Sequence, residues 1–379
     1  MGVVITIFTL LIIMFRILDR WEKLALKNLE YKRYIDKERV FIGDPVRLTT
    51  EITNDKLLIL PWIEVNANIP IEIDFKDQRV VVHNNKSEKI YKVVTSLLSF
   101  QRIKKHNTIF CKKRGYYSFN DVKMSVGDFF GFAVAEKEIH YPMKLIVYPE
   151  VKPLGQLIMP SKSIQGELSV RRWIIPDNIS VIGAREYTPY DSFNTIDWKA
   201  TARTSKLHVK KLDYTADPSI IILLNVQTSD IYWQNVNSEL IEKGIDIAAS
   251  IAHKAIDEKV DVGYSSNALF YGDNRDIFVK PSNGRKQKMI IFDALAKTSY
   301  LPIDSFDKFL SKNTRLIDKN NVIILIISHI TYDLIKKINS MIKAGYYIKL
   351  ILLDNSLKTE GLFKEVEIIY SYEFINDDK

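Results

Sequence analysis

Neutral polar side chains gather where a strongly apolar run ends in the C-terminal half of the chain. The run 219–226 reads SIIILLNV, and Asn225, Gln227 and Ser229 follow one another at alternate positions from its end. Such a run predicts a strand covered on both faces, and ligands of α/β sheets bind at the carboxyl ends of their strands. Amide and hydroxyl oxygens can coordinate Mg²⁺, but they supply no negative charge to offset the dehydration of the ion. We therefore expect no metal here.

A second apolar run, 321–328, ends at Ser328, which we expect beside the same loop because parallel strands end at one edge of a sheet. The spacing of Asn225, Gln227 and Ser229 resembles the metal-ion-dependent adhesion motif of von Willebrand factor A domains, Asp-x-Ser-x-Ser. Asn225 and Gln227 stand in place of the Asp and the first Ser. We interpret Asn225, Gln227, Ser229 and Ser328 as a degenerate ion-site loop that contacts a protein partner.

Paired acids offer a competing, catalytic interpretation. Asp191 and Asp197 lie close together in the sequence, and two carboxylates can perform acid–base chemistry in a hydrolase. A nucleophile pair of Cys111 and His106 is not expected, because their odd offset places them on opposite faces of a strand. The sequence contains no P-loop, dinucleotide-binding glycine pattern, nucleophile elbow or His-Glu-x-x-His. We expect no catalytic residues and no cofactor, and keep the hydrolase as an alternative.

Strands and helices alternate over 219–375 in the pattern of a doubly wound α/β domain. Buried strands are predicted over 219–226, 321–328 and 346–353, with another strand over 261–265. Helices are predicted over 238–259, 283–298 and 331–345, and a hairpin within 267–279.

Short strands separated by turn residues, without helical runs between them, predict a small β-sandwich over 34–150. Within it, 102–114 carries six Lys or Arg residues and no acid. The favoured interpretation is the solvated face of a hairpin. Nucleic-acid binding through 102–114 is the alternative, although the aromatic residues of a stacking platform are missing.

An uncharged apolar run, 3–15, predicts a membrane anchor over 1–20, continued by a short helix over 21–31. No basic residue precedes the run, whereas Arg16, Arg20, Lys23 and Lys27 follow it closely. The positive-inside rule then predicts a single-pass protein whose soluble part is cytoplasmic. These residues, held near anionic lipid, also account for part of the net charge of +8.

The segment 183–211 reads GAREYTPYDSFNTIDWKATARTSKLHVKK and is the most distinctive in the chain. It resembles the bacterial family known as domain of unknown function 58. The matching residues are Arg185, Glu186, Tyr187, Pro189, Asp191, Ile196, Asp197, Trp198, Lys199, Ala202, Arg203, Leu207 and Val209. Tyr190 and Asn194 depart from the family pattern, which has Gly and commonly Arg at these positions. The alternating charges of Arg185, Asp191, Asp197 and Arg203 around Trp198 predict a charge-paired turn. A structural role is the favoured interpretation, and ligand binding is the alternative.

The resemblance implies a layout as well as a partner. The layout is α+β and multidomain: an anchor over 1–20, a β-sandwich-like domain over 34–150, a linker with the signature segment over 151–218, and a von Willebrand A-like domain over 219–375. The family resemblance implies a partner among MoxR-type AAA+ ATPases, in the assembly or maturation of other proteins. We therefore expect a membrane-anchored interaction protein.

Overall fold

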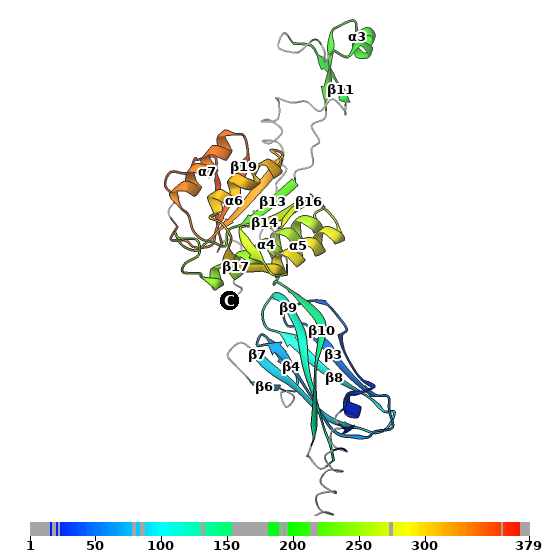
Figure 1. Ribbon diagram of the computed structural model, residues 1–379. Coiled ribbons are helices and arrows are strands. Elements are labelled where there is room, and N and C mark those ends of the chain that lie inside the picture. Colours follow the sequence, from blue (N-terminus) through cyan, green and yellow to red (C-terminus); the bar gives the residue numbers. More distant parts are fainter. Residues whose placement is uncertain are drawn as a thin grey trace, which may run out of the picture. The chain divides into compact units, whose positions relative to one another are not determined.

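The computed structural model describes residues 16, 20–21, 23–77, 81–83, 88–129, 133–153, 181–188, 193, 196–212, 219–272, 276–357 and 359–371 (Figure 1). The chain divides into two compact units. The first comprises Met1–Glu150, Leu269–Arg275 and Phe292–Ser299, and the second comprises Val151–Ala268, Asp276–Ile291 and Tyr300–Lys379. The prediction of an α+β chain is confirmed in its coarse form, since the described residues form many strands and few helices.

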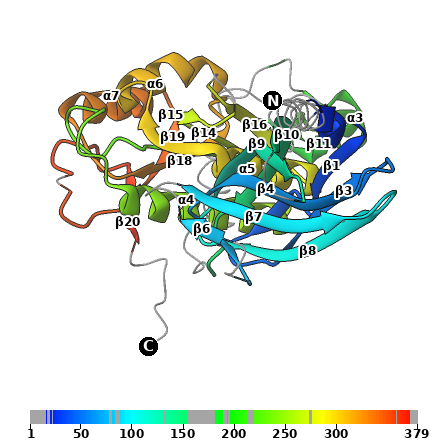
Figure 2. The same cartoon turned by 60° about the horizontal axis from the view of Figure 1, so that its bottom comes forward.

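Two sheets enclose one hydrophobic core in the first unit (Figure 2). The first sheet has the order β1 (Leu29–Ile35), β3 (Val46–Asn54), β8 (Arg102–Cys111) and β5 (Ile73–Phe75). The second has the order β2 (Arg39–Phe41), β10 (Val134–Tyr148), β9 (Gly115–Gly127), β4 (Leu60–Pro70), β7 (Glu88–Leu97) and β6 (Val81–His83). Inward residues alternate with outward ones along β4, as expected of a strand with one buried face.

Charged groups fix the segment 292–299 within the first unit. The buried guanidinium of Arg114 donates to the carbonyls of Leu295 and Thr298, at 3.0 and 2.9 Å. Arg39 contacts the Asp293 carboxylate through Nε and Nη2, at 3.1 and 3.0 Å. The same carboxylate accepts a bond of 2.8 Å from the Tyr148 hydroxyl. Bidentate bonds between ionised groups are among the stronger polar contacts, so this segment is well anchored.

The predicted helix over 21–31 is wrong in its second half. Helical residues lie between 20 and 26, and β1 begins at Leu29. Asn28 adopts a left-handed conformation with φ of 53°, which commonly ends a helix. From Leu29 onward inward and outward residues alternate, the two-residue period of a strand, and this pattern overrides the helical one.

The second unit is built on a six-stranded sheet of order β16 (Phe278–Ser282), β14 (Val262–Ser266), β13 (Ser219–Leu224), β18 (Asn321–Ile327), β19 (Tyr347–Leu352) and β20 (Glu367–Tyr370). Neighbouring strands from β14 to β20 are parallel, whereas β16 is antiparallel to β14. Chain order reverses between β13 and β18, so the loops that leave these two strands diverge at that point. Such a reversal is where open α/β sheets bind ligands.

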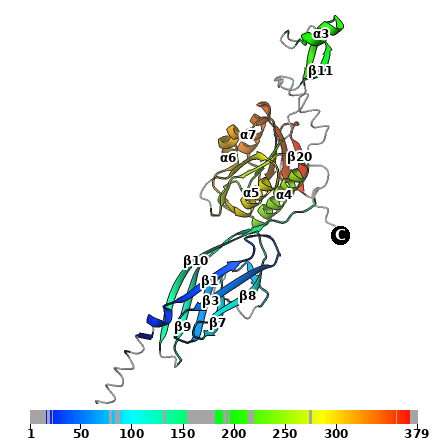
Figure 3. The same ribbon diagram turned by 90° about the vertical axis from the view of Figure 1, so that its right-hand side faces the viewer.

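Helices cover both faces of this sheet (Figure 3). Helices α6 (Phe306–Asn313) and α7 (Tyr332–Lys343) pack on the face that carries Ile221, Leu223 and Leu325. Helix α4 (Ser238–Asp257) lies on the opposite face, where Gly244 approaches Leu224 and Ile326. Helix α5 (Arg285–Lys297) follows β16. Every residue of β18 is buried, as its continuous apolar sequence predicts.

The predicted hairpin within 267–279 is wrong. Strand β15 (Ala268–Phe270) pairs with β17 (Thr298–Pro302), which lies well beyond the segment. Strand β16 instead adds to the sheet edge by pairing with β14, with Tyr264 opposite Val279. Proximity in the sequence favoured pairing of the two strands with each other, but β15 pairs with β17 and β16 pairs with β14.

Within the described residues no helix is long and apolar enough to cross a bilayer. The predicted anchor, 1–20, lies outside those residues except for Arg16 and Arg20. The anchor therefore stays a prediction.

Two glycines provide a test of packing in the second unit. A Cβ on Gly263 would lie 2.5 Å from the backbone carbonyl of Val279 and 2.9 Å from the nitrogen of Pro281. We expect Gly263→Ala to lower the free energy of unfolding by about 1–3 kcal/mol, because backbone atoms must move apart. In the control, Gly244→Ala, the Cβ meets the mobile ends of Leu224 and Leu353, and alanine gains about 1 kcal/mol of helix propensity. Urea unfolding measures the change in the free energy of unfolding of both variants. Equal changes in the two variants would contradict the close approach at Gly263.

Candidate functional site

Two amides close the loop that follows β13. Asn225 is fully buried; its Oδ1 accepts from the backbone N–H of Gln227 at 2.8 Å, and its Nδ2 donates to the carbonyl of His329 at 3.3 Å. The buried side chain of Gln227 donates through Nε2 to the carbonyl of Ser229 at 2.8 Å. Its Oε1 accepts from the N–H of Phe306, the first residue of α6, at 3.1 Å. The two amides therefore tie the loop to α6 and to the end of β18.

The predicted site residues Ser328 and Ser229 belong to the same network. The Ser328 hydroxyl is buried and donates to the carbonyl of Gln227 at 2.7 Å. The Ser229 hydroxyl contacts the carbonyls of Ile231 and Gln234 at 2.8 and 2.6 Å. The structure thus brings all four predicted residues together, and each has a protein partner.

Asn267 is a member of this network that the sequence reasoning missed. Its buried amide accepts from the N–H of Val226 at 2.9 Å and donates to the carbonyl of Asp304 at 3.0 Å. A single Asn after a strand is too common to have signalled this role. The network makes the loops that follow β13, β14, β17 and β18 mutually dependent.

The arrangement is suited to holding loops rather than to binding an ion. An amide can donate and accept, so Asn225 and Gln227 satisfy both N–H and carbonyl groups where a carboxylate could only accept. The described residues include no group of three or more His, Cys, Asp or Glu side chains that could hold a metal ion. What the site offers outward is the surface of the loops that it fixes.

That surface, which we name the rim, consists of residues 228–237 and 329–332. It carries exposed apolar side chains: Trp233 is 61% exposed, Tyr332 is 71% exposed, and Ile231 is also exposed. The two loops are joined by a contact of 2.9 Å between His329 Nε2 and the Asp230 carboxylate. The sequence Ile-Tyr-Trp within a polar loop, residues 231–233, is the signal that could have revealed the rim.

Two aromatic contacts organise the rim. The Tyr232 ring lies edge-on to the Trp233 ring, with centroids 4.7 Å apart. The Lys336 ammonium lies 4.1 Å from the centroid of the Tyr332 ring, on the next turn of α7. Aromatic residues that are already oriented lose little freedom on binding, so such positions suit a protein contact.

The signature segment forms a small lobe. Strands β11 (Val181–Glu186) and β12 (His208–Leu212) are antiparallel, and helix α3 (Trp198–Thr204) lies between them in the chain. Ile196 and Val209 are buried and bridge one another. The carboxylate of Asp197 caps α3 by accepting from the N–H groups of Lys199 and Ala200, both at 3.0 Å.

The other signature residues lie mostly on the surface of this lobe. Glu186 forms an ion pair of 3.2 Å with Lys206, and the Tyr187 ring lies 5.7 Å from the Phe193 ring. Arg185, Trp198, Lys199 and Arg203 are exposed. Asp191 lies outside the described residues, so the acid pair of the hydrolase alternative stays a prediction. Asp197 is engaged by backbone N–H groups, which is a capping role.

The basic segment 102–114 contacts acids and carbonyls in the first unit. Arg102 and Lys104 form ion pairs with Glu51 at 3.3 and 3.1 Å, and the Lys104 ammonium lowers the pKa of that carboxyl from its usual value. Lys112 forms an ion pair with Asp74. Nearby acids therefore offset part of the charge that would attract nucleic acid. That alternative stays a prediction.

A family model described as "Protein of unknown function DUF58" matches residues 183–341. The match covers the signature lobe and the second unit from β13 into α7. The chain is 22% identical over 255 residues to "Uncharacterized protein YeaD" of Bacillus subtilis strain 168. That alignment spans 67% of this chain and 58% of the relative, so part of the relative has no counterpart in the match.

Solved structures match a smaller part of the chain. A non-cellulosomal cohesin from the archaeon Archaeoglobus fulgidus matches with 7% identity and a TM-score of 0.21, covering 31% of this chain and 91% of the cohesin. Spo0M, a sporulation control protein from Bacillus subtilis, matches with 10% identity and a TM-score of 0.19, covering 32% of this chain and 50% of Spo0M. Scores this low establish neither a shared fold nor a shared function.

The amide network leads to a prediction about stability and metal. We expect Gln227→Leu to lower the free energy of unfolding by about 1–3 kcal/mol, because the Phe306 N–H loses its acceptor. The control Gln234→Leu alters an exposed amide of the same loop and should change little.

Millimolar Mg²⁺ or EDTA should leave the melting temperature of the unmodified protein unchanged. A real site occupied at 100 times its Kd would add about 2.7 kcal/mol. A clear rise with Mg²⁺ would contradict this interpretation.

Proposed function

We propose that this protein is a membrane-anchored interaction protein whose second unit is a von Willebrand A-like domain that binds a protein partner through the rim. Binding rather than catalysis is the role of this site. A mostly parallel sheet covered on both faces supports the von Willebrand A-like assignment, as does a loop with the ion-motif spacing at the point of strand reversal.

The observation that carries the proposal is the exposure of Trp233, on the internally bonded loop after β13, and of Tyr332, the first residue of α7. Folding gains nothing from exposing large aromatic side chains, whereas Trp and Tyr are enriched among residues that dominate protein interfaces. The amide network beneath them holds the loops in place without an ion. An interface that is ordered before binding avoids part of the entropy cost of association.

The partner class follows from the family resemblance: a MoxR-type AAA+ ATPase, acting with this protein in the assembly or maturation of other proteins. The similar protein YeaD is itself described as uncharacterized, so it adds no partner of its own. The proposal therefore depends on a direct capture experiment.

Photo-crosslinking from the rim tests the partner. A benzophenone amino acid in place of Trp233 or Tyr332, in the full chain expressed in its own cells, is expected to capture an AAA+ ATPase. The matched control is Leu316, an exposed apolar residue that precedes β18 and so lies toward the amino ends of the strands. Equal capture from position 316, or no captured protein from either rim position, would contradict the proposal.

Fractionation tests the anchor and its orientation. The full-length chain is expected in the membrane fraction, and deletion of residues 1–20 is expected to release it, because 3–15 is the apolar run. A protease added to intact cells should leave the first unit intact if the soluble part is cytoplasmic. Soluble full-length protein without detergent would refute the anchor, and digestion from outside would refute the orientation.

A further inference from the structure

Exposed apolar side chains gather at one end of the first unit, on two turns that join its two sheets and beside the connection between β9 and β10. Leu57 is 79% exposed, Phe100 is 63% exposed and Phe129 is 82% exposed. Ile59, Leu98 and Val134 are exposed beside them in the sequence. Soluble proteins seldom expose a group of large apolar side chains unless something covers it.

Strand registers place these residues at a common end. The turn 55–59 leads from β3 into β4, and the turn 98–101 leads from β7 into β8, so both cross between the sheets. Leu60 is opposite Leu97, and Trp62 is opposite Gly127, which precedes Phe129. We name this end the loop end.

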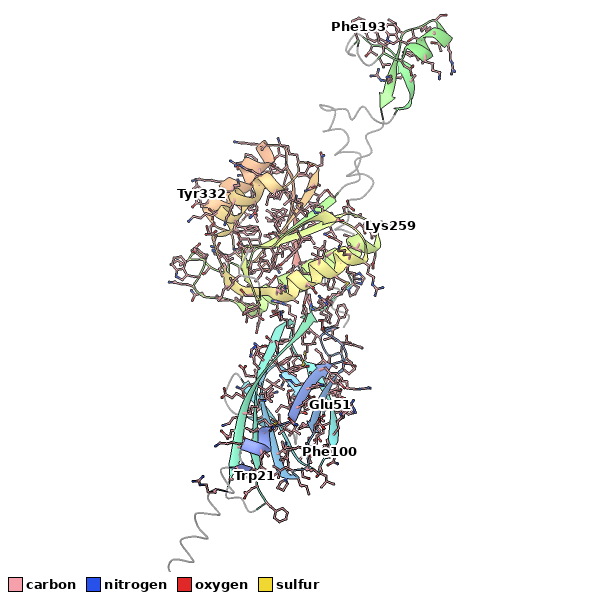
Figure 4. All side chains as sticks on the ribbon, turned by 45° about the vertical axis from the view of Figure 1, so that its right-hand side comes forward. Trp21, Glu51, Phe100, Phe193, Lys259 and Tyr332 are labelled. Atoms are coloured by element: carbon pink, nitrogen blue, oxygen red, sulfur yellow. The ribbon has the colours of Figure 1, made fainter. Side chains whose placement is uncertain are left out.

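The loop end is also where the chain enters the first unit from the predicted anchor. The helical residues 20, 21 and 23–26 lead to Asn28, which exchanges two bonds with Asp55. The Asp55 N–H donates to the Asn28 carbonyl at 2.9 Å, and Asn28 Nδ2 donates to the Asp55 carbonyl at 3.3 Å. Trp21 and Leu58 both pack against the core of the unit. Figure 4 shows Trp21 and Phe100 at the same end of the unit.

The turns hold their apolar side chains outward on a well-bonded backbone. The buried amide of Asn54 donates to the carbonyls of Leu58 and Leu98, both at 2.8 Å, and so joins the two turns. The Ser99 hydroxyl donates to the Leu57 carbonyl at 2.5 Å. Phe100 adopts a left-handed backbone with φ of 55°, a conformation that costs energy for a bulky residue. A strained, exposed Phe in a fixed turn indicates a binding role rather than a packing role.

We propose that the loop end rests on the bilayer and that Leu57, Phe100 and Phe129 enter its interfacial layer. This inference rests on the anchor of the proposed function, because residues 21–26 leave little chain between the predicted span and the turns. The exposed cations Arg16, Arg20, Lys23 and Lys27 lie in the segment of the sequence that leads to this end, and they favour anionic headgroups. The loop end therefore adds a second, peripheral contact with the membrane and fixes the orientation of the first unit on it.

Site-specific labelling of the full chain tests this contact. The native cysteine, Cys111, is 1% exposed, and burial raises its pKa to about 12, so its thiol resists labelling. Leu57→Cys and Phe100→Cys, each carrying an environment-sensitive fluorophore, are reconstituted in vesicles of mixed neutral and anionic phospholipids. The control, Ile42→Cys, is an exposed apolar position in the turn before β3. It lies about 30 Å away, the length of a nine-residue strand.

We expect blue-shifted emission at positions 57 and 100, with quenching by lipids that carry a spin label near the headgroups, about 5–10 Å deep. Position 42 should show neither effect. Vesicle-bound protein with water-like emission at 57 and 100 would overturn this inference and leave the anchor intact. Blue-shifted emission without lipid quenching would mean that a protein, such as a second copy, covers the loop end, which also overturns it. Failure of the full chain to associate with vesicles would overturn the anchor and this inference together.

Discussion

The satisfaction of buried polar groups where β13 ends is the constraint on which the functional surface depends. β13 lies between β14 and β18 in a sheet that is covered on both faces, so the loop leaving it begins inside the protein. Asn225 is fully buried there, and its neighbours need hydrogen-bond partners that water cannot supply. The amides of Asn225, Gln227 and Asn267 provide them. Each ties one loop to another, so the rim has a defined shape before any partner arrives.

At position 225 an amide takes the place that a carboxylate has in the ion-binding motif. A carboxylate at position 225 would accept bonds only and would bring a charge into a buried site, a cost that a bound cation could offset. An amide brings no charge and bonds both ways, so the loop closes by itself. What remains available is an outer surface with Trp233 and Tyr332, together with the loop end of the first unit. Both surfaces combine exposed apolar side chains with well-bonded backbones.

The sequence predicted the buried parallel strands well. The runs 219–226, 321–328 and 346–353 correspond to β13, β18 and β19 within one or two residues, because strands covered on both faces are apolar throughout. The sequence was a poorer guide where pairing with a distant strand decides the local structure. The residues at the start of β1 fit both a helix and a strand, and pairing with β3 determined the outcome. Asn225, Gln227 and Ser229 share one loop, and Ser328 lies beside it because β13 and β18 are parallel neighbours. Asn267 and the rim aromatics depend on tertiary contacts and exposure that the spacing of residues does not encode.

Hydrogen exchange at the amides of Val226, Gln227 and Phe306 tests the central claim, that the protein itself closes the rim network. These N–H groups bond to Asn267, Asn225 and Gln227 respectively. Exchange is measured on the full chain after EDTA treatment and again with millimolar Mg²⁺. The account predicts strong and equal protection of the three amides in both conditions. Rapid exchange in EDTA that becomes slow when Mg²⁺ is added would contradict it, because an ion rather than the amides would then hold the loops.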